Sequence, residues 1–296
     1  MKKRTLGQSE FQISEISLGC MSLSPNAAEA NQVIAAAIDA GINYFDTADL
    51  YDRGVNEQIV GAALKKHRQN IILATKVGNR WEECKDGWHW DASAAYIKQA
   101  VYNSLQRLQT DYIDLYQLHG GTIDDNWEEI IDTFEGLKKD GIIREYGISS
   151  IRPNVFVPFL ENSDAISNMM QFNIFDERAS EFFPSIQAAG ASVVTRGTVA
   201  KGLLTNEWRE RLKGFMSYNE TEAKALLEKL EQQFEDVHAA ALAFNLQYNA
   251  VASTVIGART VEQLTQNLVA YEKAQSIQDI AIVSNWTKKD RYTDHR

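Results

Sequence analysis

Residues 41–51 decide the fold, and they read Gly41-Ile-Asn-Tyr-Phe-Asp-Thr-Ala-Asp-Leu-Tyr51. A glycine that can end a helix is followed by the short apolar run 42–45, which gives way to a polar loop at Asp46. Two further apolar runs end in the same way, one immediately before Lys76 and one immediately before His119. Each run is therefore predicted to be a buried strand that carries a polar side chain at its carboxyl end.

Strand-like runs alternate with helical segments along the rest of the chain, which favours βα units and a parallel sheet. We expect eight strands, which begin near Ile16, Asn43, Ile71, Tyr112, Ile143, Ser167, Ser192 and Thr254. Residues 4–6 and 11–13 are expected to form a leading β-hairpin. Eight units in 296 residues predict an α/β fold, a (β/α)8 TIM barrel, with residues 1–296 as a single domain.

Local signals place the helices and weaken one alternative fold. Ser24-Pro25 is expected to start the first helix, and Gly41 is expected to end it. A doubly wound sheet is the alternative, but no G-x-G-x-x-G motif follows a strand, so a Rossmann cofactor site is unsupported. Residues 197–202 have the glycine spacing of a P-loop, but Leu203 stands where that motif needs lysine.

Composition limits the classes of partner. The formal net charge of −10 argues against binding to nucleic acid or to an anionic membrane, so an anionic ligand would need a local basic pocket. No apolar run approaches the roughly 18 residues of a membrane span. Cys20 and Cys84 lack metal-ligand spacing, which favours a reduced, cytoplasmic protein without a metal, although a disulfide between them stays open.

Asp46, Tyr51, Lys76 and His119 together suit the protonation of a carbonyl group. A carbonyl that accepts hydride develops negative charge on oxygen, and a nearby acid lowers that barrier. A phenol beside an ammonium is a better acid than a free phenol, and a carboxylate keeps the ammonium charged. An imidazole can donate a second hydrogen bond to the oxygen. Taken singly, each residue also has an ordinary structural interpretation, such as a helix cap for Asp46 or a solvated amine for Lys76.

The motifs of the chain resemble those of the aldo-keto reductases over essentially the whole sequence. The resemblance rests on segments 41–51, 56–61, 74–76, 111–119 and 141–149. Segment 56–61 reads Asn56-Glu-Gln-Ile-Val-Gly61, and segment 141–149 reads Gly141-Ile-Ile-Arg-Glu-Tyr-Gly-Ile-Ser149. The chain is similar to small uncharacterised bacterial members of that family. The resemblance implies a (β/α)8 barrel enzyme that uses NAD(P)H to reduce aldehydes or ketones, with Tyr51 as general acid and Asp46, Lys76 and His119 as its catalytic partners.

The resemblance also implies an NADPH site without a Rossmann domain. Ser149 and Gln171 match residues that hold the nicotinamide carboxamide, Arg196 could stack on the ring, and Arg259 suits an adenosine 2′-phosphate. Ser150 and Gln263 replace common family choices. The implied cofactor contacts are Gly19, Cys20, Met21, Asp46, Ser149, Gln171, Arg196, Gly197, Thr198, Ala200, Lys201, Gly202, Ile256, Gly257, Ala258, Arg259, Gln263 and Asn267.

The substrate is not specified by any motif. An aromatic pocket is expected from Met21, Leu50, Trp81, Trp88, Trp90 and Phe175, and a small aldehyde is the expected substrate. No obligate protein partner is expected. Two other functions are alternatives to carbonyl reduction. One is an NADPH-binding, redox-sensing module like the channel-associated members of the family, and the other is a barrel lyase or aldolase with Lys76 as Schiff-base nucleophile.

Overall fold

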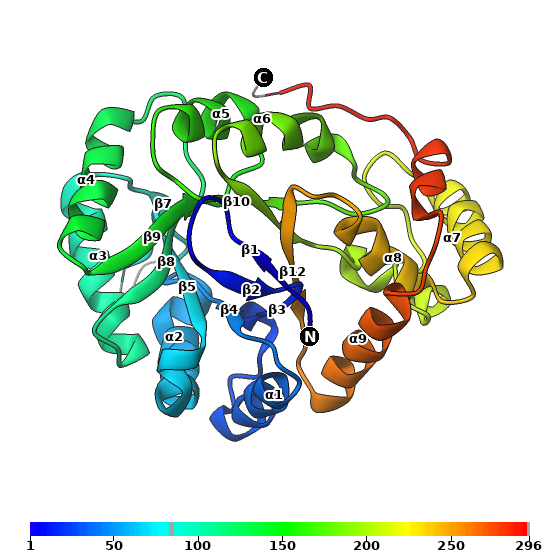
Figure 1. The fold of residues 1–296 in the computed structure, drawn as a ribbon, viewed down its shortest axis with the longest axis horizontal. Coiled ribbons are helices and arrows are strands. Elements are labelled where there is room, and N and C mark those ends of the chain that lie inside the picture. Colours follow the sequence, from blue (N-terminus) through cyan, green and yellow to red (C-terminus); the bar gives the residue numbers. More distant parts are fainter. Residues whose placement is uncertain (83–85, 295–296) are drawn as a thin grey trace.

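The computed structural model describes residues 1–82 and 86–294, and a closed barrel of parallel strands lies at its centre (Figure 1). The strands follow one another around the barrel in chain order, and β9 pairs with β10 along one side. They are β3 (Ile16–Gly19), β4 (Tyr44–Asp46), β5 (Ile72–Val77), β8 (Ile113–Leu118), β9 (Ile143–Ile148), β10 (Ser167–Gln171), β11 (Ser192–Arg196) and β12 (Val251–Gly257).

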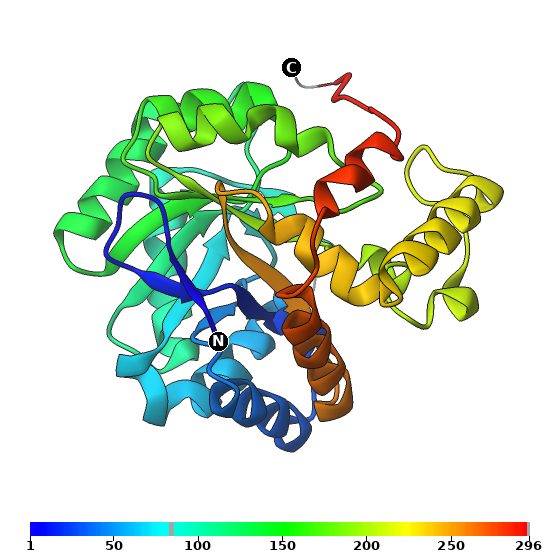
Figure 2. The ribbon, with the colours of Figure 1, turned by 45° about the vertical axis from the view of Figure 1, so that its right-hand side comes forward.

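Helices surround the barrel as an outer ring (Figures 1 and 2). Most of them connect one barrel strand to the next, two helices connect β11 to β12, and the final helix follows the last strand, β12. The helices are α1 (Ala27–Asp39), α2 (Val55–Leu64), α3 (Ala94–Leu108), α4 (Trp127–Lys139), α5 (Pro153–Glu161), α6 (Phe183–Ala188), α7 (Glu220–Phe234), α8 (Val237–Leu246) and α9 (Val261–Ala274).

An amino-terminal hairpin closes one end of the barrel. Strand β1 (Lys3–Thr5) pairs antiparallel with β2 (Gln12–Ser14). The Gly7 N–H donates to Ser192 Oγ at 2.8 Å, and the Arg4 guanidinium donates to the Val251 carbonyl at 2.8 Å. Ser192 and Val251 begin their strands, so the hairpin covers the amino ends and leaves the carboxyl ends open.

The expected strands are confirmed, and the barrel replaces the doubly wound alternative. Seven strands begin within one residue of the expected position, and the last begins at Val251 rather than near Thr254. The expected start of α1 at Ser24-Pro25 was wrong. Asn26 is the N-cap, because its side chain accepts from the Ala28 N–H at 2.9 Å, and Ser24 Oγ only supports the turn before it by accepting from the Asn26 N–H.

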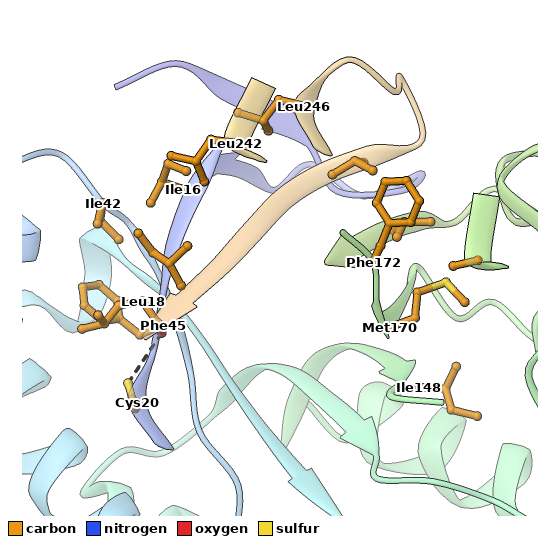
Figure 3. Packing of buried hydrophobic residues seen from close by; sticks show 14 of the residues in the cluster. Ile16, Leu18, Cys20, Ile42, Phe45, Ile148, Met170, Phe172, Leu242 and Leu246 are labelled. Atoms are coloured by element: carbon orange, nitrogen blue, oxygen red, sulfur yellow. Dashed lines mark hydrogen bonds between the residues drawn. The ribbon is translucent and has the colours of Figure 1, made fainter. Parts of the chain in front are cut away.

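Apolar side chains form two packed regions, one inside the barrel and one between strands and helices. The inner region joins Leu6 and Ile13 of the hairpin region to one face of the barrel strands. Figure 3 shows part of the outer region, where Leu18 and Phe45 lie near one another and Phe172 lies on another part of the wall. The carboxyl ends of the strands are therefore held in place by close-packed side chains on both sides of the barrel wall.

The carboxyl-terminal segment that starts at Asn285 docks on the barrel. Tyr292 is buried, and the Arg178 guanidinium lies 4.6 Å from the centre of its ring. Lys288 Nζ forms an ion pair with Glu222 at 2.6 Å, and Lys289 pairs with Glu177 at 3.4 Å. As far as Tyr292, the segment is therefore docked on the barrel.

Cys20 is buried as a free thiol, and Cys84 lies outside the described residues, so their pairing is not addressed by the structure. Within residues 1–82 and 86–294, no helix has both the length and the apolarity needed to cross a membrane.

Candidate active site

Alternation along three neighbouring strands brings polar side chains into one layer of the barrel. One residue of each strand belongs to the inner apolar region, namely Tyr44, Ala74 and Leu115. Side chains two residues apart on a strand point to the same side. The next inward residues, Asp46, Lys76 and Gln117, therefore lie together inside the barrel toward its open end.

Lys76 and Asp46 form a buried ion pair at the centre of this layer. Lys76 Nζ lies 2.5 Å from Asp46 Oδ1 and donates to the Thr47 carbonyl at 2.7 Å. Gln117 Nε2 donates to the other carboxylate oxygen at 3.1 Å. Burial lowers the pKa of Lys76, but the adjacent carboxylate outweighs this effect and raises the pKa above its usual value. The lysine is therefore a fixed ammonium.

Tyr51 reaches the ammonium from the loop that follows β4. Lys76 Nζ lies 3.4 Å from the Tyr51 hydroxyl oxygen. The loop turns sharply after the tyrosine, because Asp52 and Arg53 have φ of 47° and 52° before Gly54, which precedes α2. The phenol therefore has a cation on one side and an open cavity on the other.

His119 lies across from Tyr51, just after the end of β8. The two ring centroids are 6.0 Å apart, with the planes at 85°. Burial, followed by the positive charges of Lys76 and Arg196, lowers the pKa of His119 to about 3. The imidazole is therefore neutral near pH 7, and its Nδ1 has no hydrogen-bond partner within the described chain.

Residues 56 and 57, which the sequence offered only as part of a motif, support the loop that carries Tyr51. Asn56 accepts from Thr47 Oγ1 at 2.7 Å and donates to the Cys20 carbonyl at 2.8 Å. Glu57 is fully buried, accepts from Thr75 Oγ1 at 2.6 Å, and pairs with Arg107 at 2.6 Å. These contacts tie α2 to β4 and β5, which carry Asp46 and Lys76.

A cavity of about 770 Å³ opens over this layer, at the carboxyl ends of the strands. Asp46, Tyr51 and His119 line it, and fully buried Lys76 lies beneath. Most of the expected cofactor residues also line it: Gly19, Met21, Asp46, Ser149, Gln171, Arg196, Gly197, Thr198, Ala200, Lys201, Ile256 and Gly257. Residues from seven separate strand ends are thus gathered around one space.

A second cavity of about 560 Å³ continues from the first, with Lys201 and Gly257 on both walls. It is lined by three more of the expected cofactor residues: Gly202, Gln263 and Asn267. The other three line neither cavity. Cys20 and Ala258 are buried, and Arg259 is exposed just before α9, where its N–H donates to Gln263 Oε1 at 2.8 Å.

The expected aromatic pocket is formed only in part. Met21, Leu50, Trp88 and Trp90 line the large cavity. Trp81 does not, because its Nε1 donates to the Asp49 carbonyl and its ring lines a separate small cavity. Phe175 is buried against Phe215 and Tyr218. Trp81 and Phe175 therefore pack outside the large cavity instead of lining it as expected.

Trp90 keeps its place because two glycines leave room for its ring. A Cβ added to Gly78 would lie 2.6 Å from the Trp90 ring, and one added to Gly120 would lie 3.1 Å from it. Trp90 Nε1 donates to Asp125 at 2.8 Å, which fixes the indole. One glycine comes from the loop after β5 and the other from the loop after β8.

Sequence reasoning missed the residues that hold Gln171. Asp176 is buried, accepts from Gln171 Nε2 at 2.7 Å, and receives two hydrogen bonds from Arg178 at 2.7 and 2.9 Å. The Arg178 guanidinium in turn faces Tyr292 of the docked carboxyl-terminal segment. The signal available in the sequence was the short spacing within Gln171-Phe-Asn-Ile-Phe-Asp176-Glu-Arg178.

It also missed Arg152, a basic residue on the cavity wall. Arg152 follows β9 and is the N-cap of α5. Its Nη1 donates to the Gly121 carbonyl at 2.9 Å, and both residues line the cavity. A lone arginine in a loop has no periodic or motif signal, so only the fold reveals its position.

At its open end the (β/α)8 barrel thus carries a phenol, an ammonium–carboxylate pair and a neutral imidazole, a set of groups suited to an enzyme that acts on a carbonyl group. The chain matches the model of the aldo/keto reductase family over residues 15–287. It belongs to this family of NAD(P)H-dependent, carbonyl-reducing enzymes.

Three relatives illustrate the range of similarity. The uncharacterized oxidoreductase YqkF of Bacillus subtilis (strain 168) is 49% identical, with 100% of both chains covered. The holo form of aldo-keto reductase AKR11C1 from Bacillus halodurans has a TM-score of 0.94 and 49% identity, covering 100% of this chain and 99% of that one. The NADH-specific methylglyoxal reductase of Escherichia coli (strain K12) is 27% identical over 91% of this chain and 93% of its own.

Proposed function

We propose that this protein uses NADPH to reduce aldehydes or ketones to alcohols, with Tyr51 as the general acid. The observation that carries the proposal is the 3.4 Å approach of the Tyr51 hydroxyl to Lys76 Nζ, at the wall of a large cavity. The Asp46–Lys76 pair fixes that ammonium beneath the phenol. An acid supported by a fixed positive charge is what a carbonyl oxygen requires when it becomes an alkoxide.

Tyr51, Lys76 and His119 have separate roles in the proposed reaction. Tyr51 donates its proton to the carbonyl oxygen, and Lys76 stabilises the phenolate that remains. His119 is neutral, so it can donate one hydrogen bond to the same oxygen without adding a charge. Bound NADPH would supply the hydride. Trp88 and Trp90 line the cavity and add apolar surface to its wall.

The two cavities fit an extended dinucleotide. Ser149 and Gln171 offer polar groups near Tyr51, and exposed Arg196 has no ion pair within the described part of the chain. The buried Thr198 Oγ1 has no hydrogen-bond partner among residues 1–82 and 86–294, so a ligand group would satisfy it. Lys201 stands where the two cavities meet, which suits a diphosphate between the nicotinamide and adenosine ends.

Arg259 supports NADPH over NADH. It is exposed immediately before the N-cap Thr260 of α9, and no ion pair engages its guanidinium in the described residues. A helix amino end and a free guanidinium together favour a dianionic 2′-phosphate. The E. coli relative is described as NADH-specific, so the preference must be measured for this chain.

The decisive experiment compares Tyr51→Phe with the unchanged protein. We expect kcat to fall by about 10²- to 10⁴-fold, the range for loss of a general acid. The Kd for NADPH, measured by fluorescence, should stay the same because the ring is retained. Tyr102→Phe is the matched control, since Tyr102 is exposed on the outer face of the barrel helices. Full turnover by Tyr51→Phe would remove this residue from its role.

A panel of aldehydes and ketones, assayed with NADPH and NADH in parallel, tests the reaction and the cofactor together. We expect a higher kcat/KM with NADPH, and we expect Arg259→Ser to weaken NADPH binding while leaving NADH binding unchanged. An equal loss of affinity for NADPH and for NADH in Arg259→Ser would assign Arg259 another role. Absence of turnover with every carbonyl, with tight NADPH binding retained, would favour the redox-sensing module instead.

A further inference from the structure

The large cavity is basic, although the chain as a whole is acidic. Its charged lining residues are Asp46, Arg152, Arg196 and Lys201. Asp46 is neutralised by Lys76, whereas the three basic residues have no carboxylate within 4 Å among residues 1–82 and 86–294. In a chain of net charge −10, such a cavity concentrates positive potential where a ligand would lie.

Two of these cations lie on the proposed cofactor side, and the third does not. Arg196 ends β11 and Lys201 lies in the loop after it, the loop proposed to contact the diphosphate. Arg152 follows β9 instead. Strand β9 pairs with β8, whose end carries His119. Arg152 is thus a positive charge on the side of the barrel where the carbonyl substrate would be protonated.

Arg152 is held so that one edge of its guanidinium is free. Nη1 donates to the Gly121 carbonyl at 2.9 Å, whereas Nε and Nη2 have no acceptor in the described chain. A close backbone approach allows this anchor, because a Cβ on Gly121 would lie 2.6 Å from Val155 of α5. The Nε–Nη2 edge is the fork that binds a carboxylate through two parallel hydrogen bonds.

The surroundings of Arg152 add to this preference for an anion. The residue is half-buried, so its interaction with a ligand is screened less than at an open surface. It is also the N-cap of the nine-residue helix α5, and no side chain accepts a hydrogen bond at that helix start. The positive end of the helix therefore reinforces the guanidinium.

We propose that Arg152 forms a carboxylate subsite, so that the preferred substrates are carbonyl compounds that carry a carboxylate. This inference rests on the carbonyl reduction proposed above. It names the class of substrate that the residues of the cavity select, and it assigns Arg152 to substrate binding rather than to the cofactor.

The test uses pairs of substrates that differ only in charge. The probes are 3- and 4-carboxybenzaldehyde and their methyl esters, assayed with NADPH on the full chain. For the unchanged protein we expect kcat/KM to favour the acids. Arg152→Met should lower the acid-to-ester ratio by about 10- to 100-fold, the usual strength of a charged hydrogen bond. The loss should appear in KM for the acids, and the esters should be unaffected.

Two further variants separate this role from a structural one. Arg152→Lys keeps the charge without the fork, so the ratio should fall less than in Arg152→Met. Arg144→Met is the matched control, because Arg144 lies on β9 near the end of the strand that is opposite to Arg152, and its side chain is 52% exposed. The melting temperature of each variant confirms that it folds.

The outcomes distinguish this inference from the proposed function. An unchanged acid-to-ester ratio in Arg152→Met, with esters still reduced, would overturn the subsite and leave carbonyl reduction standing. A rise in the NADPH Kd of Arg152→Met would also overturn it, by placing Arg152 in the cofactor site. If neither protein reduces any probe, carbonyl reduction fails. Calorimetry with terephthalate, which cannot be reduced in this assay, then decides the subsite by whether Arg152→Met abolishes binding.

Discussion

Gln171 Nε2 donates a hydrogen bond to Asp176 Oδ2 at 2.7 Å. A carboxylate can only accept, so it fixes which end of the amide faces inward to Asp176 and which end faces the cavity. The amide oxygen is therefore left for the cavity, where it can accept from a nicotinamide carboxamide. Arg178 and the docked carboxyl-terminal segment stabilise Asp176 from behind.

We expect Asp176→Asn to weaken NADPH binding about tenfold, which corresponds to roughly 1.4 kcal/mol. The new amide can donate as well as accept, so Gln171 is free to turn its nitrogen toward the cavity. Fluorescence titration with NADPH measures the change. Asp164→Asn is the control, since Asp164 is exposed. Equal Kd values for the two variants would show that Asp176 does not orient Gln171.

His119 should make folding stability fall in acid. The folded imidazole has a pKa of about 3, against 6.5 when unfolded. Between these values the unfolded chain binds more protons, so the free energy of unfolding decreases as pH falls, by up to about 1.4 kcal/mol per pH unit. His119→Asn should remove this part of the acid sensitivity in urea unfolding at pH 7, 5.5 and 4.5. Exposed His67→Asn should keep it.

Asp49 should have the opposite dependence on pH. Burial, followed by the charge of Glu57, raises its pKa to about 8, and its Oδ1 has no partner in the described residues. The folded chain then holds a proton that the unfolded chain releases above about pH 4, so this contribution to stability is lost as pH rises toward 8.

Asp49→Asn should therefore stabilise the protein more at pH 8 than at pH 4, by about 1–3 kcal/mol. Chemical unfolding at the two pH values measures the difference. Asp52→Asn, at an exposed position in the same loop, should show no such difference. A constant effect of Asp49→Asn at both pH values would contradict the raised pKa.

Gly78→Ala should disturb the wall of the large cavity at Trp90. Gly78 has φ of +125°, and the added methyl would lie 2.6 Å from the Trp90 ring. We expect a loss of about 1–3 kcal/mol in stability and a higher KM for aldehydes, because Trp90 must move. Gly136→Ala in α4 is the control, since its methyl meets nothing within 4 Å and should stabilise the helix by about 0.5–1 kcal/mol. An unchanged KM in Gly78→Ala would show that Trp90 does not contact the substrate.

Local patterns predicted the barrel because they depend on neighbours along the chain. The run before Asp46, its repetition before Lys76 and His119, and the glycine after α1 each mark an element boundary without reference to distant residues. The start of α1 was placed two residues early because Ser24 and Asn26 are both good caps, and only the backbone path selects Asn26.

Contacts between residues distant in sequence decided which side chains line the cavity. Trp81 and Phe175 looked like pocket residues by type, but partners distant in the chain turn them away from the cavity: the Asp49 carbonyl for Trp81, and Phe215 and Tyr218 for Phe175. The support of Gln171 reaches Tyr292, more than a hundred residues away in sequence. Such pairs have no local signal.

The sequence by itself determined the barrel, its strand order and the identity of the four polar residues, because periodicity and strand-end position are properties of short segments. Only the tertiary structure decided which groups share the cavity with them. Parallel pairing of β8 with β9 places the ends of these two strands side by side, which brings Arg152 to Gly121 near His119. The four polar residues at the barrel mouth could be predicted from local patterns, whereas the shape and charge of the cavity around them arise from packing between distant segments.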